Sequence, residues 1–372
     1  MALSPTEAGK RRKTRIVIVR MSDVQTPTFY QQWFDPAGLA PMSREKLAAL
    51  SSNPMRRGDD EPVQLLGLLG DEVIGRLDLI AGALVVDDHT LPLSWASAFT
   101  VLPEMRHTLI GLKLVREIQR LNLVVAACGI SKMAYPIYKR FGWIDFVMPR
   151  YILLRHSRPV IERSLHPRAA LTAARVIDTL LAMYTKCVLR GTNGLIELRL
   201  DTSVTPELAR TIRCSRNTFM PRSAETLNWR LRSSFRTDQR NRNFLLTLTS
   251  HGEIVGYALL KLRYHAVASA RGFRDVMLGS VQEWLIFNSR LLCYRTLITM
   301  ACRELIRHNV DAVEVCAATD EEAFVLRRMG MKRVGEQHLM WYPSPGTRIA
   351  STEYRQQSNW MIRSGEGDDF FS

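Results

Sequence analysis

The sequence predicts an α/β fold in which one unit of strands and helices occurs twice. Residues 68–80 and 249–261 each place turn residues ahead of an acidic residue, two β-branched residues and a glycine, which is the pattern of a β-hairpin. Residues 134–143 and 323–331 each resemble a helix that ends on a glycine. The spacing along the chain from one hairpin to the other nearly equals the spacing between the two helix ends, which indicates an internal repeat.

Length and composition are consistent with two globular units. The 372 residues exceed the usual length of one domain, and an apolar content of 46% is enough to fill a core in each half. The chain has no run of 18 apolar residues and no long apolar segment near its start, so we expect neither a membrane-spanning helix nor a secretory signal. Its six cysteines are scattered without a C-x-x-C pair, which indicates neither a zinc site nor a disulfide framework and predicts a cytoplasmic protein.

We expect the first unit over residues 1–158. A strand-like segment near its start is followed by the hairpin at 68–80 and by residues 95–102, whose apolar and β-branched side chains are typical of a strand. Pro103 ends that strand. Apolar residues then recur at a three-residue spacing from 112 to 121, which predicts an amphipathic helix.

A basic turn over residues 106–112 joins that strand to that helix. Unpaired backbone N–H groups converge at the start of a helix, and the helix dipole there favours negative charge. Arg106 and Lys113 add positive charge. The turn is therefore a candidate binding site for a diphosphate, with an ordinary strand-to-helix connection as the alternative.

A basic linker is expected over residues 159–195. Within it, residues 168–190 place apolar side chains on one helical face and arginine or lysine elsewhere, which predicts an amphipathic helix. Such a helix either lies on an anionic membrane surface or packs as a strut between the two units. Both interpretations are open from the sequence.

The second unit is expected over residues 196–345, as a degenerate copy of the first. Residues 274–305 pass from strand to helix without the basic, glycine-containing turn, and Leu326 stands where the first unit has Tyr138. We therefore expect this copy to have lost the diphosphate site and to serve a structural or acceptor-binding role. The polar residues 346–372 predict a flexible tail.

The order of elements resembles the GNAT N-acyltransferase superfamily. In that family a glycine-turned hairpin precedes a strand ending in V-x-P, a loop reading R/Q-x-x-G-x-G/A, a helix, a strand and a short helix ending in Y-x-x-x-G-F. Here Val101-Leu102-Pro103 ends the strand, and the loop keeps Arg106 and Gly111 but has Leu109 in place of its first glycine. The short helix matches through Tyr138, four residues before its closing glycine.

The resemblance implies two tandem GNAT-like units, each a mixed, mostly antiparallel twisted sheet flanked by helices. It implies an N-acyltransferase that moves an acyl group from acyl-CoA to a primary amine by direct attack in a ternary complex, without a metal. Tyr138 would protonate the departing CoA thiolate, and backbone groups of Phe99 and Val101 would pair with the pantetheine arm. The residues implied for CoA binding are Phe99, Val101, Arg106, His107, Thr108, Leu109, Ile110, Gly111, Leu112 and Ser131.

The sequence does not reveal a general base. Family members often hold a Glu or Asp on the strand at 95–102, but the nearest polar residue here is Ser97. Glu72 and Asp78 of the hairpin are candidate substitutes, and a solvated position on the surface is the ordinary interpretation of both.

The net charge of +15 predicts an anionic partner, and the sequence leaves several classes open. A CoA donor, an acidic acyl carrier protein and an anionic membrane surface are all partners that suit a basic chain. Binding to a membrane surface would place the protein on the inner face of the membrane. The amine acceptor is either a small molecule or lipid-like, for example a sphingoid base, as in a ceramide-synthase-like role, or an amino sugar.

Two other functions compete with the acyl-CoA transferase. A Fem-type aminoacyl transferase also pairs two GNAT-like units and uses charged tRNA, which suits a basic chain. Such a protein is not expected to retain the loop at Arg106 and the tyrosine at 138, so nucleic acid is disfavoured as a partner. A non-catalytic binding protein with the GNAT fold is the other alternative, favoured by Leu109 and by the missing base.

Overall fold

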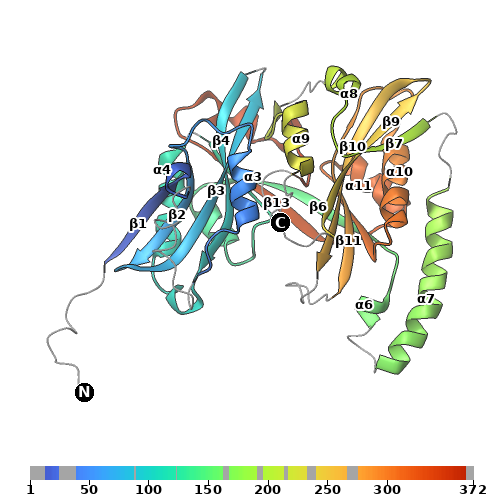
Figure 1. The fold of residues 1–372 in the computed structure, drawn as a ribbon, viewed down its shortest axis with the longest axis horizontal. Coiled ribbons are helices and arrows are strands. Elements are labelled where there is room, and N and C mark those ends of the chain that lie inside the picture. The colour runs from blue at the N-terminus through green and yellow to red at the C-terminus, as the bar shows by residue number, and fades with distance from the viewer. Residues whose placement is uncertain are drawn as a thin grey trace.

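Fourteen strands of the described chain form one continuous sheet in the computed structural model, with helices on both of its faces (Figure 1). The sheet is mixed and mostly antiparallel. Within the part of the chain that the structure describes, only three pairs of neighbouring strands are parallel: β4 with β5, β11 with β12, and β8 with β14. The structure describes residues 13–24, 39–87, 89–122, 124–161, 167–190, 196–212, 217–232, 240–265 and 275–365.

The first half contains the predicted hairpin, strand, helix, strand, helix and strand in that order. The elements are β1 (Thr14–Arg20), α1 (Met21–Val24), α3 (Arg44–Ser51), β2 (Pro62–Leu69), β3 (Glu72–Val86), β4 (His89–Val101), η1 (Pro103–Met105), α4 (Ile110–Leu121), β5 (Val124–Cys128), α5 (Tyr135–Arg140), β6 (Ile144–Leu154) and α6 (Arg158–Ile161).

The second half repeats this order after the long helix α7 (Pro167–Val188). Its elements are β7 (Ile196–Asp201), α8 (Pro206–Thr211), β8 (Asn217–Thr218), α9 (Ala224–Arg232), β9 (Arg242–Ser250), β10 (Glu253–His265), β11 (Val276–Ile286), α10 (Tyr294–Arg307), β12 (Ala312–Cys316), α11 (Asp320–Arg328), β13 (Lys332–Pro343), η2 (Arg348–Ala350), η3 (Thr352–Arg355), η4 (Gln357–Asn359) and β14 (Trp360–Met361).

The two halves exchange their last strands. The sheet order is β1-β2-β3-β4-β5-β13-β6-β12-β11-β10-β9-β7, so β13 of the second half pairs with β5 of the first half. Strand β6 of the first half pairs in turn with β12 of the second half. Leu339 lies opposite Cys128 in one of these ladders, and Arg150 lies opposite Cys316 in the other. Each half therefore supplies a strand that completes the sheet of the other half.

The local signals of the repeat are confirmed. The turns between β2 and β3 and between β9 and β10 contain Gly70 and Gly252, both with positive φ. Helices α5 and α11 each end just before a glycine in the left-handed region, Gly142 with φ +77° and Gly330 with φ +71°. A side chain at Gly330 would also collide with the hydroxyl of Tyr184 on α7, so this glycine lets α7 lie close to the end of α11.

Helices α4 and α5 cover one face of the sheet in the first half. Leu114, Val115 and Ile118 of α4 are fully buried and pack in one core with Tyr138 of α5. Their spacing places all three on one side of the helix. The opposite face carries α3, α9 and the C-terminal segment, and the Nε1 of Trp229 on α9 donates to the carbonyl of Ala49 on α3, 2.8 Å away.

The prediction of a flexible tail over residues 346–372 is wrong for residues 346–365. This segment is packed into the core: Ile362 is fully buried, and the ring of Trp360 stacks on Phe219 with ring centroids 4.6 Å apart. The segment is polar on average, but a few widely spaced apolar side chains are enough to anchor it in the core. Residues 366–372 lie outside the described residues.

The predicted amphipathic helix at 168–190 is present as α7, which runs along one end of the molecule (Figure 1). Ala174, Thr185 and Leu189 are buried on its inner side, and Asp178 accepts hydrogen bonds from the N–H and hydroxyl of Ser157. None of the described helices is both long enough and apolar enough to cross a membrane.

Candidate functional site

Strands β4 and β5 separate at the end of the first unit's sheet. Their parallel ladder covers only Ser94–Ala96 opposite 125–127, whereas β4 continues to Val101. The register with β3 shifts between Arg76 and Asp78, and Ala98 has φ +46°, so β4 carries a bulge where the strands separate. The bulge bends the strand and leaves the β5-facing edge of 97–101 outside the ladder, where an extended ligand could pair with it.

The N-terminus of α4 points toward the same end of β4. Its N-cap is Leu109, whose side chain makes no capping hydrogen bond, and the first intrahelical backbone bond runs from Lys113 N to Leu109 O. The three N–H groups before Lys113 therefore have no partner within the helix. They lie at the start of a 12-residue helix, where the sequence predicts an anion site, and that role stays a prediction.

The missing first glycine of the loop does not distort the backbone. Leu109 has φ −78° and ψ 14°, a conformation open to any residue, and its side chain is 64% exposed. Arg106 is exposed, and its side chain has no hydrogen bond or ion pair with any of the described residues. Lys113 differs from the expectation, because its Nζ binds the hydroxyl of Thr14 on β1 and not the loop.

Gly111 and Phe99 bring α4, β4 and α5 together. A Cβ at Gly111 would lie 3.3 Å from Phe99 Cζ and 3.6 Å from Val101 Cγ2, so glycine allows the helix to approach the strand. The ring of Phe99 meets Tyr138 edge-on with centroids 6.0 Å apart, and Tyr138 meets Trp143 at 4.5 Å. Tyr138 is 2% exposed.

The structure thus gathers most of the sequence-predicted residues around the open edge of β4, while their chemical roles stay predictions. The exposed Ser131 accepts a hydrogen bond from the N–H of Ala134, the residue just before α5. Thr108 donates to the carbonyl of Met105 at 2.7 Å and stiffens the loop. These residues lie on β4, in the loop before α4, at the start of α4 or on α5, and they are Phe99, Val101, Arg106, His107, Thr108, Leu109, Ile110, Gly111, Leu112 and Tyr138.

Asp78 is buried, which corrects its interpretation as a surface charge. It is fully buried on β3, opposite Ser97 at the bulge of β4. Its carboxylate accepts from Lys46 Nζ of α3 and from Gln64 Nε2, both at 2.6 Å, and Lys46 also reaches Ser97 Oγ at 3.2 Å. Two polar residues inside the apolar strands β2 and β3 were the signal for this cluster. Glu72 is exposed at the hairpin.

A second acid–base cluster contains a residue of the second half. His338 on β13 places Nδ1 3.0 Å from Asp145 on β6, and Tyr135 of α5 donates to the same carboxylate at 2.8 Å. The hydrogen bond to Asp145 raises the pKa of Tyr135. The carbonyl of His338 accepts from the N–H of Gly129, so the cluster lies at the end of β5, one strand from the opening. Sequence alone could not place His338 here, because the strand exchange brings it in.

The corresponding opening in the second half is filled by the chain itself. The ladder of β11 with β12 ends at Val281, just before a bulge at Gln282. The N–H of Gly365 donates to the carbonyl of Gln282 at 2.8 Å, and Ser364 Oγ donates to that of Val281 at 3.2 Å. Leu326 of α11 is fully buried at the place that corresponds to Tyr138. The expectation that the second copy has no donor site stays a prediction.

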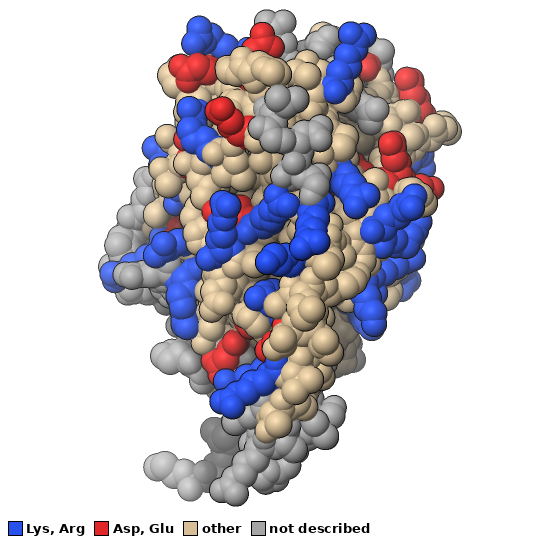
Figure 2. All heavy atoms as spheres, turned by 90° about the vertical axis from the view of Figure 1, so that its right-hand side faces the viewer, with Lys and Arg blue, Asp and Glu red and all other residues tan. Residues whose placement is uncertain are grey.

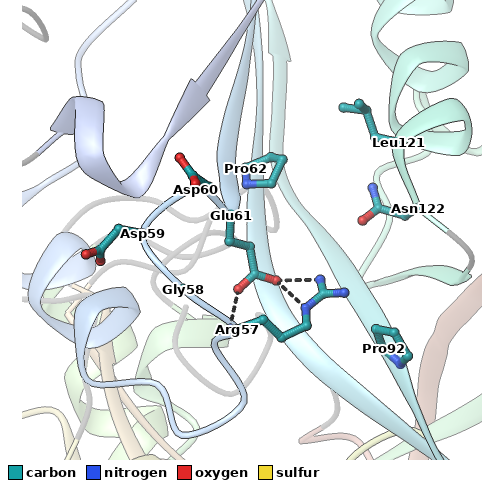
Figure 3. Close-up of a pocket in the computed structure, with 9 residues that line it drawn as sticks. All are labelled: Arg57, Gly58, Asp59, Asp60, Glu61, Pro62, Pro92, Leu121 and Asn122. Carbon is teal, nitrogen blue, oxygen red and sulfur yellow. Dashed lines mark hydrogen bonds and ion pairs between the residues drawn. The ribbon is translucent and has the colours of Figure 1, made fainter.

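A surface pocket of about 420 Å³ lies away from the open edge of β4 (Figure 3). Pro62, Pro92 and Asn122 line it, at the start of β2, near the start of β4 and just after α4. The Glu61 carboxylate in it is already held by Arg57, as the dashed lines show. Helix α4 is about 18 Å long, so the pocket is distant from the anion site. In the described ranges, no three His, Cys, Asp or Glu side chains are grouped so as to hold a metal ion.

Solved structures of low sequence identity share this fold. N-myristoyltransferase of Saccharomyces cerevisiae with bound myristoyl-CoA has a TM-score of 0.58 at 9% identity, covering 94% of this chain and 89% of that one. A tandem GNAT protein from the clavulanic acid biosynthesis pathway has a TM-score of 0.52 at 14% identity, covering 90% and 100%. A GCN5-related N-acetyltransferase from Anabaena variabilis has a TM-score of 0.50 at 8% identity, covering 89% and 73%.

Sequence comparison adds no closer relationship. No protein-family model matches the chain, and no curated protein matches its sequence. At identities this low, the structural likeness establishes the fold and not the activity. The predicted architecture is confirmed at that level: the chain has a tandem GNAT fold.

Proposed function

We propose that this protein is an N-acyltransferase that moves an acyl group from acyl-CoA to a primary amine. The observation that carries the proposal is the convergence, in the first unit only, of the open edge of β4, the uncapped start of α4 and Tyr138. The yeast N-myristoyltransferase of the same fold binds myristoyl-CoA, which supports a CoA-type donor.

This geometry supports the following mode of donor binding. The CoA diphosphate accepts from the N–H groups at the start of α4, and Arg106 adds a positive charge. The pantetheine arm pairs with the β4 edge near Phe99 and Val101 as an added strand. This arrangement places the thioester where a backbone N–H near Val101 polarises its carbonyl.

Transfer then needs no covalent enzyme intermediate. The amine attacks the thioester carbon, a C–N bond forms, and the carbonyl oxygen takes up the negative charge. Collapse of this adduct breaks the C–S bond, and the Tyr138 hydroxyl donates a proton to the departing thiolate. A base accepts the proton that the amine nitrogen loses, and solvent restores the proton of the tyrosine.

We assign the role of base to His338, acting through a water molecule. Its Nδ1 is held by Asp145, which orients the ring, and its side chain is 25% exposed. The assignment predicts that His338→Gln lowers kcat/KM at neutral pH about 10-fold, below a full general-base effect because water can accept the proton. The CoA dissociation constant should not change. A parental kcat/KM in the variant would remove His338 from the mechanism.

The proposed acceptor is a primary amine, with lipid-like amines such as sphingoid bases and amino sugars as the classes to test. The experiment measures thiol release from acetyl-CoA and from long-chain acyl-CoA with three amines: a long-chain amine, an amino sugar and an amino acid. Release that depends on an amine supports the proposal. CoA binding without release for any of these amines would indicate a non-catalytic binding protein.

Charge reversal at the loop tests the donor site directly. Arg106→Glu is expected to weaken CoA binding by about 2 kcal/mol, because a charge-assisted contact becomes a repulsive one. Calorimetry with CoA measures the effect, and Arg116→Glu, an exposed position further along α4, is the matched control for net charge. Equal affinities of the two variants would place the diphosphate elsewhere.

A further inference from the structure

Helix α7 exposes an apolar stripe on the side that faces away from the protein. Val176, Leu180 and Met183 are 60%, 61% and 62% exposed, and Ile177 beside them is 38% exposed. These four residues, here called the α7 stripe, are four of the eleven exposed large apolar side chains in the described chain. Their spacing of three or four residues places them on one face of the helix. Exposed apolar surface is therefore concentrated on one short segment.

The inner side of α7 already packs against the rest of the protein. Ala174, Thr185 and Leu189 are buried, and Leu189 belongs to the core of the second half. Asp178 accepts hydrogen bonds from Ser157. With about 100° of rotation per residue, Val176, Leu180 and Met183 lie roughly opposite these residues, and Ile177 lies to one side. While these contacts persist, the stripe stays exposed among the residues that the structure describes.

Positive charge borders the stripe. Arg175, Lys186 and Arg190 are exposed along one flank, and Asp178, the only acidic residue between 167 and 190, lies on the inner side. Figure 2 views this end of the molecule and shows Lys and Arg side chains gathered around an uncharged column, with few acidic side chains nearby. The surface therefore combines an apolar strip with a basic surround.

We propose that α7 docks the protein on an anionic lipid surface. An outward apolar strip with basic flanks lets a helix lie in the membrane interface, with its apolar side chains among the acyl chains and its cations at the head groups. A second copy of the chain fits less well, because two such helices would bring their basic flanks together on molecules of net charge +15.

The docking surface lies far from the candidate donor site. Figure 1 places α7 at the opposite end of the molecule from α4. Docking therefore attaches the protein to the membrane without bringing the candidate donor site of the first unit against the bilayer. The proposal is independent of the acyl-transfer reaction and can be tested on binding alone.

The test is flotation of the full chain with vesicles of phosphatidylcholine alone and of phosphatidylcholine mixed about two to one with phosphatidylserine. Binding should require phosphatidylserine and should weaken as salt rises from about 50 mM to about 500 mM, because ionic screening shortens the reach of the charges. Leu180→Gln with Met183→Gln, and separately Arg175→Gln with Lys186→Gln and Arg190→Gln, should each lower the vesicle partition coefficient on the order of 10-fold.

Matched controls separate local from general effects. Leu291→Gln removes an apolar side chain that is 38% exposed elsewhere, and Arg116→Gln with Arg140→Gln and Arg232→Gln removes three exposed charges elsewhere. Both controls should bind as the parent does, and the melting temperature of every variant should match the parent. The proposal would be overturned if the protein bound no vesicles at every salt concentration. It would also be overturned if the three-charge control lost as much vesicle binding as the α7 variants. A dimer in sedimentation that Leu180→Gln with Met183→Gln abolishes would overturn it too, by assigning the stripe to a second copy.

Discussion

Replacing Tyr138 with phenylalanine is expected to slow acyl transfer by about 100-fold, the lower end of a general-acid contribution. The variant keeps the ring that packs on Phe99 and Trp143 and loses only the hydroxyl. The CoA thiolate must then leave without a nearby proton donor. CoA affinity should not change, because the proposed donor contacts are those of α4 and β4.

The measurement is thiol release under single turnover, alongside calorimetry with CoA. Tyr342→Phe is the control, because this residue packs against the same core cluster and the substitution also removes one hydroxyl. Equal slowing in both variants would indicate a packing effect. Turnover of Tyr138→Phe at the parental rate would place the acid on another group.

Short-range sequence signals made the repeat and the candidate donor site predictable. The hairpin turns, the glycine ends of α5 and α11, and the basic loop between β4 and α4 each depend on a few adjacent residues. Backbone conformation at such positions is decided by local sterics and hydrogen bonding, which residue type reports directly. Tyr138 was found for the same reason, since its place is set by counting back from the helix end.

The strand exchange could not be predicted, because it depends on pairing between distant segments. Alternating apolar residues indicate a strand but not which edge it joins. Leu339 lies opposite Cys128 although the two residues belong to opposite halves of the chain. His338 reaches the first unit only through this pairing, so a search within one repeat would miss it. The buried state of Asp78 was hidden likewise, since its partner Lys46 belongs to a different element.

Glu283→Gln is expected to lower the free energy of unfolding by about 3–5 kcal/mol, because it leaves buried arginine charge uncompensated. Glu283 lies on β11 and pairs with Arg230 of α9 and with Arg222, whose Nε is 3.4 Å away. Tyr257 donates to the same carboxylate at 2.6 Å. All these charged side chains are about 1% exposed, so solvent does not screen them.

The pKa of Glu283 gives the pH dependence. Burial alone would raise the pKa of this carboxyl, but Arg230 and Arg222 outweigh that effect and lower the pKa to about 2. A carboxyl with a depressed pKa in the folded state contributes its full stabilisation above its unfolded pKa, near 4.5, and loses it as the pH falls toward 2. The difference between parent and Glu283→Gln should therefore be constant above about pH 5 and shrink in acid.

Denaturant unfolding at pH 7 and pH 3 measures the loss of stability and its dependence on pH. Glu336→Gln is the control and should change stability little, because its partner Arg333 is exposed. Replacing Arg222, Arg230 and Glu283 together with Met, Met and Leu should lower the free energy of unfolding less than the single change does, since no charge of this cluster stays buried.

The same cluster holds the tail that fills the opening in the second half, because Arg230 donates to the carbonyl of Gly365 at 3.0 Å. Glu283→Gln should thus also speed amide exchange at Gly365. A pH-independent loss of stability, with unchanged exchange at Gly365, would show that the cluster neither depends on charge nor secures the tail.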